Sequence, residues 1–212
     1  VMSLGRTFEE SLLKAVRSLE IGVNHIYMKK FDEYTKEQLM EYIKDGTDDR
    51  IYAIAKLLEY GADSGRIWSA TKIDMFFLEK LRNIVHMQST SKNAPMDLDV
   101  LRCAKKMGFS DAYIASLWNC PEIDVWHMRE QNNIFPVYKM IDTCAAEAQG
   151  YIPYFYSTYE QENESIVSDR KKVVVLGSGP IRIGQGVEFD YSSVHAVQTI
   201  RSAGYEAIII NN

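Results

Sequence analysis

The stretch Thr71-Lys-Ile-Asp-Met-Phe-Phe-Leu-Glu-Lys-Leu-Arg-Asn-Ile-Val-His-Met-Gln88 is the longest helical pattern in this chain of 212 residues. It begins in the polar range Thr71 to Asp74, and apolar residues then recur at helical spacing. These residues are Phe77, Leu78, Leu81, Ile84 and Val85. Because residues three and four positions apart share one face of a helix, the stretch predicts a largely buried helix that reaches about Gln88.

Three helices are predicted on its N-terminal side. The first begins with a capping box, in which the Thr7 hydroxyl accepts from a first-turn amide and Glu10 reaches back. Its apolar face is formed by Phe8, Leu12, Ala15, Val16 and Leu19, up to Gly22. The second helix begins at Thr35 to Gln38 and runs to Gly46, and the third is capped by Asp48 or Asp49 and runs to Gly61.

Three shorter helices are predicted on its C-terminal side, at Leu98 to Met107, Asp111 to Trp118 and Glu122 to Gln131. Ser110 is a suitable cap for the second, and Pro121 stands at the start of the third, where its missing N–H costs nothing. No strand pattern interrupts residues 5 to 132. The fold class is therefore mainly α, with an all-α orthogonal helical bundle in this region.

The pattern changes after Pro136. The ranges 137–141 and 151–159 are rich in β-branched and aromatic residues, which suit strands, although Pro153 restricts the second to an edge or irregular strand. Residues 160–168 are polar and acidic, as in a linker.

From Lys171 the pattern is strand, helix, strand. Val173 to Leu176 predicts a buried strand, Ser192 or Ser193 is expected to cap a helix that ends at Gly204, and Tyr205 to Ile210 predicts a second buried strand. This is a partial α/β unit, the start of a Rossmann-like, doubly wound parallel sheet. Because two strands leave unpaired edges, we expect the unit to continue beyond Asn212.

Composition argues against several classes of protein. The apolar set makes up 46% of the residues and the net charge is −5, with Lys and Arg scattered among acids, so no nucleic-acid partner is expected. No apolar run is long enough to cross a bilayer and no secretory signal is evident, which predicts a cytoplasmic protein without membrane contact. Scattered Cys103, Cys120 and Cys144 and four separated histidines predict no metal site.

The first strand runs into a glycine loop, Gly177 to Tyr191. Gly177 and Gly179 match the start of a dinucleotide fingerprint, but Arg182 occupies the place of the third glycine. Tight turns and close packing also explain both glycines. The polar residues Arg182, Gln185, Glu188 and Asp190 gather at the carboxyl end of the strand, where open α/β sheets bind ligands.

Three ordered segments resemble the large subunit of carbamoyl-phosphate synthetase. The longest is Val174-Val-Leu-Gly-Ser-Gly-Pro-Ile-Arg-Ile-Gly-Gln-Gly-Val-Glu-Phe-Asp-Tyr191, with His195, Arg201, Gly204 and Asn211 after it. The other two are Val1 to Glu10 and Val137 to Glu147, the latter followed by Tyr156 to Glu160. The resemblance implies residues 1–20 as the end of the first synthetase half and 21–150 as the helical oligomerisation domain. It further implies 151–168 as a linker and 169–212 as the truncated start of the second pre-ATP-grasp domain.

The resemblance also implies an activity. The parent enzyme makes carbamoyl phosphate from bicarbonate, two ATP and ammonia that a separate glutaminase small subunit releases from glutamine, and it uses magnesium or manganese and potassium. It serves pyrimidine or arginine biosynthesis. No ATP-grasp catalytic residue and no cofactor is expected in this fragment, which should be inactive alone.

Carboxyphosphate and carbamate decompose in water, so enzymes of this family pass them through an internal tunnel. By the resemblance, Gly186 and Glu188 line the carbamate passage. Glu188 is equally suited to a helix N-terminus, where an acid is favoured by the helix dipole. Arg182 and Gln185 are candidates for orienting phosphate or substrate, or for hydrogen bonding within the loop.

The resemblance makes the parent a homo-oligomer joined through its helical region. The large aromatic residues there are Trp68, Phe76, Phe77, Tyr113, Trp118 and Trp126, more than a small bundle needs inside. For each of them core packing is the expected role. A nicotinamide dehydrogenase fragment and a non-catalytic helical interaction module are the alternatives; the first lacks an acid at the end of the second strand, where Asn211 and Asn212 stand.

Overall fold

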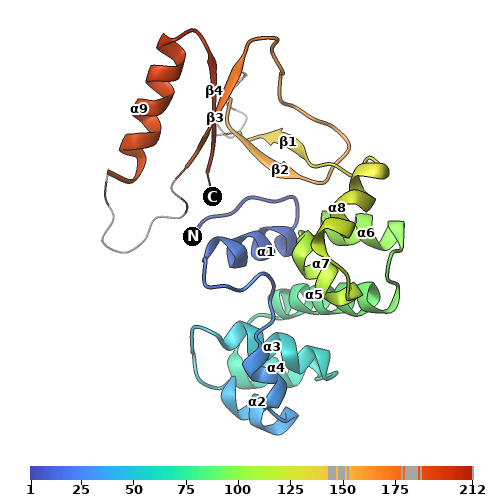
Figure 1. Ribbon diagram of the computed structural model, residues 1–212. Helices are drawn as coiled ribbons and strands as arrows, with labels where there is room; N and C mark the ends of the chain where they lie inside the picture. The colour runs from blue at the N-terminus through green and yellow to red at the C-terminus, as the bar shows by residue number, and fades with distance from the viewer. Residues whose placement is uncertain are drawn as a thin grey trace.

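The computed structural model describes residues 1–142, 147, 151, 153–177, 179, 186 and 188–211, without the side chains of residues 188 and 189. A helical region lies beside two small sheets of two strands each (Figure 1). The predicted class, mainly α with a small α/β unit at its C-terminal end, is confirmed.

The helix α5 (Met75–Asn93) crosses the middle of the helical region (Figure 1). On one side lie the 3₁₀ helix η1 (Lys29–Glu33), α2 (Lys36–Tyr42), α3 (Arg50–Glu59) and α4 (Ser64–Thr71). On the other side lie α1 (Phe8–Ser18), α6 (Leu98–Lys106), α7 (Asp111–Trp118) and α8 (Glu122–Gln131). The predicted central helix is therefore the element around which the others are arranged.

A single core joins these helices. Side chains that are fully inaccessible to solvent come from both sides of α5 and include Leu13, Leu39, Leu57, Ile67, Leu78, Ile84, Leu101, Ile114 and Val125. Burial of apolar surface is the main driving force for folding, so the two groups of helices stabilise each other through α5. On α1 the predicted Val16 is buried, but the apolar face differs from the prediction at two positions: Leu13, which was not predicted, is buried, and Leu19 is exposed.

The predicted helix caps are largely confirmed. Thr35 and Gln38 form a complete capping box, and the Ser110 hydroxyl accepts a hydrogen bond from Tyr113 N at 3.2 Å. The Thr7 hydroxyl accepts from Glu10 N at 3.2 Å, but the Glu10 carboxylate accepts from Arg6 N at 2.7 Å. The donor to the Glu10 carboxylate is therefore the backbone N–H of Arg6, one residue before the predicted donor, Thr7.

Two helix boundaries were predicted wrongly, and one predicted cap residue is in place without its hydrogen bond. Thr71 ends α4, a helix that was not predicted, and Asp74 alone caps α5 by accepting from Phe76 N. Asp49 is the N-cap residue of α3 but makes no cap hydrogen bond, because its carboxylate binds Lys30 and Tyr42 instead. The last helix, α9 (Glu188–Ser202), begins before the predicted caps Ser192 and Ser193.

The predicted strands are present. β1 (Val137–Met140) and β2 (Phe155–Thr158) pair antiparallel, and β3 (Lys172–Leu176) and β4 (Glu206–Ile210) pair in parallel with α9 between them in sequence. The range 151–168, predicted as a linker, contains β2. After β2 in the same range, Glu164 N donates to Tyr138 O of β1 at 2.9 Å. The β3 and β4 side chains were expected to be buried. Val174, Leu176 and Ile210 are exposed, because two strands and one helix cover only part of this sheet.

Candidate functional site

The glycine turn after β3 is held by Asn211, which follows β4. Gly177 N donates to Ile210 O at 2.8 Å, and Gly179 N donates to Asn211 Oδ1 at 3.1 Å. A Cβ atom on Gly177 would lie 2.3 Å from Asn211 Oδ1, and Gly179 has a φ of +84°. The structural explanation of both glycines, close packing and a left-handed turn, is therefore confirmed.

The same turn lies against the helical region. A Cβ atom on Gly179 would lie 3.0 Å from Oε1 of Glu20, which follows α1. The carboxyl end of the parallel sheet, where α/β proteins bind ligands, thus faces the end of the first helix.

The predicted loop residues are only partly described. Gly186 is exposed and Glu188 is the first residue of α9, in agreement with an acid at a helix N-terminus. Arg182 and Gln185 lie outside the described residues, as does Cys144. The structure therefore places Glu188 in a helix, and the roles of all four site residues remain predictions.

Two exposed aromatic side chains of α5 and the half-buried Phe8 of α1 form a second candidate site. The ring of Phe8 lies 6.1 Å from that of Phe76 and 5.4 Å from that of Phe77, and the last two rings are 5.3 Å apart. Phe76 is 54% exposed and Phe77 44%. We call Phe8, Phe76 and Phe77 the aromatic face. Core packing was predicted for the latter two and is wrong, because they point away from the core on the first turn of α5.

Of the other four large aromatic residues, two are buried and two are exposed. Tyr113 and Trp118 are buried, and the Trp118 indole donates to Ser91 O at 2.8 Å, so the predicted core role is confirmed for these two. Trp68 and Trp126 are exposed, against the prediction.

Charges of both signs border the aromatic face. Lys80 Nζ lies 5.4 Å from the centre of the Phe76 ring and 3.4 Å from Glu9 Oε1. Burial alone would raise the pKa of the Glu9 carboxyl, but the hydrogen bond from Asn83 and the charge of Lys80 lower it below its usual value. Glu9 therefore remains ionised beside the apolar rings.

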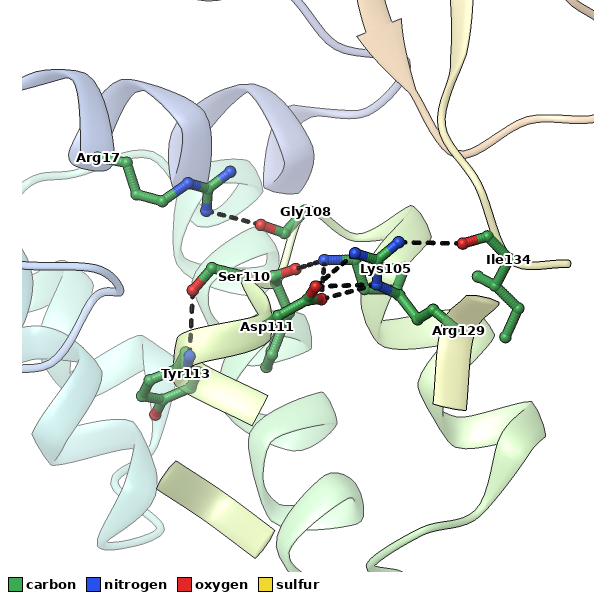
Figure 2. A network of polar contacts seen from close by, with 9 residues as sticks. Arg17, Lys105, Gly108, Ser110, Asp111, Tyr113, Arg129 and Ile134 are labelled. Carbon is green, nitrogen blue, oxygen red and sulfur yellow. Dashed lines mark hydrogen bonds and ion pairs between the residues drawn. The ribbon is translucent and has the colours of Figure 1, made fainter. Parts of the chain in front are cut away.

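A buried ion network joins α6, α7 and α8 (Figure 2). Asp111 binds Lys105 Nζ at 2.8 Å and Arg129 Nη2 at 2.5 Å, and the three side chains are 12%, 7% and 10% exposed. Lys105 also donates to Phe109 O at 2.8 Å and Arg129 to Ile134 O at 3.1 Å. Nearby, Arg17 of α1 donates to Gly108 O at 2.7 Å. The sequence did not predict this network.

The pKa values in the network follow from burial and pairing. Burial lowers the pKa of Lys105 to about 8, although the charge of Asp111 opposes this shift. For Asp111, burial raises the pKa, but hydrogen bonds and charge from Arg129 and Lys105 outweigh it and lower the value. Two cations thus share one buried carboxylate.

Comparison with protein families matches both parts of the chain. Residues 1–133 match the model described as carbamoyl-phosphate synthetase large chain, oligomerisation domain. The chain belongs to the carbamoyl-phosphate synthetase large chain family. Residues 169–212 match the carbamoyl phosphate synthase preATP-grasp domain, in agreement with the resemblance seen in the sequence.

Membership of the carbamoyl-phosphate synthetase family gives the general role. The matched domains belong to the large chain of carbamoyl-phosphate synthetase, a ligase, and residues 1–133 correspond to its oligomerisation domain. Among the described residues, no group of three or more His, Cys, Asp and Glu side chains is placed to hold a metal ion. None of the described helices is both long enough and apolar enough to span a bilayer.

Proposed function

We propose that this chain is part of the large subunit of a glutamine-dependent carbamoyl-phosphate synthetase, in which its helical region holds large subunits together. The observation that supports this role most strongly is the match of residues 1–133 to the family's oligomerisation domain. The helices of that range share one core, so the region can present a fixed surface to a second copy.

The aromatic face is the part of that surface that we propose as the contact. Its rings are in mutual contact, and exposed aromatic clusters of this kind are typical of the centres of protein interfaces. Its border carries Lys80 paired with Glu9, and a second pair of opposite charges, Glu79 and Arg82, lies further along α5. In a two-fold symmetric dimer each patch meets its own copy, so a border with both signs is complementary to itself.

Sedimentation velocity at several concentrations of the whole chain tests this proposal. The double variant Phe76→Ser, Phe77→Ser should raise the dissociation constant about tenfold or more, since aromatic side chains dominate interface energies. Phe135→Ser is the matched control, because Phe135 is 50% exposed and lies after α8, outside the aromatic face. A chain that stays monomeric at every concentration contradicts self-association. If all variants associate equally, self-association stands and the contact lies elsewhere.

For the glycine loop, we propose a role in carrying carbamate between active sites, with Gly186 and Glu188 lining the passage. Carbamate must be sheltered because it decomposes in water. A residue without a side chain at position 186 leaves room for passage, and an acidic residue is favoured at position 188, the first residue of α9, by the helix dipole. Arg182 and Gln185 are proposed to orient phosphate or substrate in the same loop.

We assign ATP, magnesium or manganese, potassium and the glutaminase small subunit to other parts of the enzyme. The matched regions are an oligomerisation domain and a preATP-grasp domain, and neither is an ATP-grasp domain. The chain alone should therefore hydrolyse no ATP. An ATPase assay with bicarbonate, with and without the glutaminase subunit, tests this, and turnover by the chain alone contradicts it.

A further inference from the structure

The end of β2 is bound to α1 through Lys14. Its ammonium group donates to Ser157 O at 2.6 Å and to Leu4 O at 2.8 Å, and pairs with Glu10 Oε1 at 2.7 Å. The same nitrogen lies 5.5 Å from the centre of the Tyr156 ring. One side chain of the helical region therefore holds the N-terminal segment and the β hairpin together.

Tyr159, two residues after Ser157, lies over the buried ion network of Lys105, Asp111 and Arg129. Lys105 Nζ lies 4.9 Å from the centre of its ring and the Arg129 guanidinium carbon 5.9 Å, so two cations from α6 and α8 face one ring. Thr158, between the two contacts, is only 2% exposed. The last residues of the hairpin thus contact three helices, α1, α6 and α8.

The charge of the network explains why an aromatic ring suits position 159. Lys105 and Arg129 share the single carboxylate of Asp111 and donate their other hydrogen bonds to backbone carbonyls. The electron-rich face of an aromatic ring attracts the surplus positive charge in a site with little water. An aliphatic side chain of similar size would fill the space without this attraction.

The chain beyond Tyr159 is tied to the hairpin as well. Tyr138 N donates to Asn163 Oδ1 at 2.8 Å, Met140 N donates to Glu164 Oε2 at 2.7 Å, and Lys139 pairs with Glu164 at 3.0 Å. The segment that leads to β3 therefore runs along β1 before it enters the preATP-grasp region. Its starting position depends on where the hairpin is bound.

We infer that residues 156–159 form a joint that fixes the preATP-grasp region relative to the oligomerisation region, and that Tyr159 is its positioning residue. Lys14 holds the backbone on one side, and the Asp111 network holds the Tyr159 ring on the other. This inference goes beyond the proposed self-association, because it concerns the placement of two regions within one chain and not contact between chains.

Distance measurement between spin labels tests the joint in the whole chain. One label goes on Cys103, which is exposed on α6, and the other on Gln198→Cys, exposed on α9, with Cys120 and Cys144 changed to Ser. Tyr159→Phe should keep the narrow distance distribution of the parent chain. Tyr159→Leu should broaden it, and amide exchange in β1 and β2 should rise about tenfold while α3 and α5 stay protected.

Tyr154→Leu is the matched control, because Tyr154 is 50% exposed in the same hairpin and should change neither measurement. If Tyr159→Leu keeps a narrow distribution and slow exchange, the joint does not depend on Tyr159 and the inference is wrong. The inference is also wrong if exchange rises equally in α3 and α5, because Tyr159 is then a general core residue. Lys14→Met tests the second contact with the same measurements, and a narrow distribution in that variant removes Lys14 from the joint.

Discussion

The guanidinium group of Arg129 donates two hydrogen bonds to Oδ2 of Asp111, from Nε at 2.9 Å and from Nη2 at 2.5 Å. Arg129 lies on α8 and Asp111 on the first turn of α7, so the pair holds two consecutive helices together (Figure 2). Because Lys105 binds the same carboxylate, Asp111 is the centre on which both buried cations depend. The members of this network should therefore differ greatly in their importance for stability.

Asp111→Asn should destabilise the helical region by about 3–5 kcal/mol, since it leaves two buried cations without a carboxylate. Lys105→Met should cost much less, because it removes a surplus cation and keeps the Asp111–Arg129 pair. Urea denaturation followed by circular dichroism gives both free energies of unfolding. Asp99→Asn is the control: its carboxylate is 92% exposed and pairs with Arg102 at the surface. That change should cost less than about 1 kcal/mol. Equal costs for the Asp111 and Lys105 variants would contradict the assigned centre.

A second prediction concerns His25 and the loss of stability at low pH. The imidazole is 1% exposed, stacks on Tyr113 at 3.7 Å, and neither ring nitrogen finds a hydrogen-bond partner among the described residues. Burial, with the charge of Arg17, lowers its pKa to about 3. Below pH 6.5 the unfolded chain takes up a proton that the folded chain does not accept until about pH 3. The free energy of unfolding should therefore fall by about 1.4 kcal/mol for each pH unit within this window.

His25→Phe and His25→Gln should both remove this contribution. The two variants will differ in absolute stability, because Phe keeps the stacking and Gln does not, but their pH slopes between 6 and 4.5 should agree. Urea denaturation at several pH values gives the slopes. His86→Gln, at an exposed position of α5, should keep the parent slope. A parent slope retained in both His25 variants would mean that other groups cause the acid sensitivity.

The helices could be predicted from sequence because their signals are local. Apolar spacing located α5, and the Thr35 and Ser110 caps gave boundaries that the structure confirms. The helix α4 was missed because Gly65 lies in its first turn and few of its side chains are buried. The start of α9 was missed because Ser192 and Ser193 offered caps inside a helix that already begins at Glu188.

The candidate sites depend on tertiary contacts, which one sequence does not show. Lys105, Asp111 and Arg129 are separated along the chain, and each is of a residue type that is usually exposed. Phe77 and Leu78 are adjacent and equally apolar, yet one is exposed and the other is fully buried, because the face of α5 that meets the core is set by its neighbours. The turn at Gly177 and Gly179 could be predicted from its residues, since tight turns restrict residue type directly.

In the full-length enzyme, Gly186→Phe should block the transfer of carbamate and so abolish carbamoyl phosphate formation, while bicarbonate-dependent ATP hydrolysis continues. The physical reason is that an aromatic side chain fills a passage that a glycine leaves open. Assays of the overall reaction and of the bicarbonate-dependent ATPase separate the two steps. Gly186→Ala is the matched control and should leave most of the overall rate. Equal loss of both activities in the Phe variant would count against a passage at this position.

The contact between Gly177 and Asn211 gives a last prediction. A Cβ atom on Gly177 would lie 2.3 Å from Asn211 Oδ1 and 2.6 Å from its Cγ, so Gly177→Ala must displace the Asn211 side chain, which directly follows β4. The expected cost is about 1–3 kcal/mol, typical of overpacking, and should appear as faster amide exchange in β3 and β4. The change should be smaller when Asn211→Gly is also present, since that substitution removes the atoms in conflict. Gly46→Ala is the control, because its Cβ would meet only Arg50 Nη1 at 4.0 Å. Equal acceleration with and without Asn211→Gly would show that Gly177 is required for another reason.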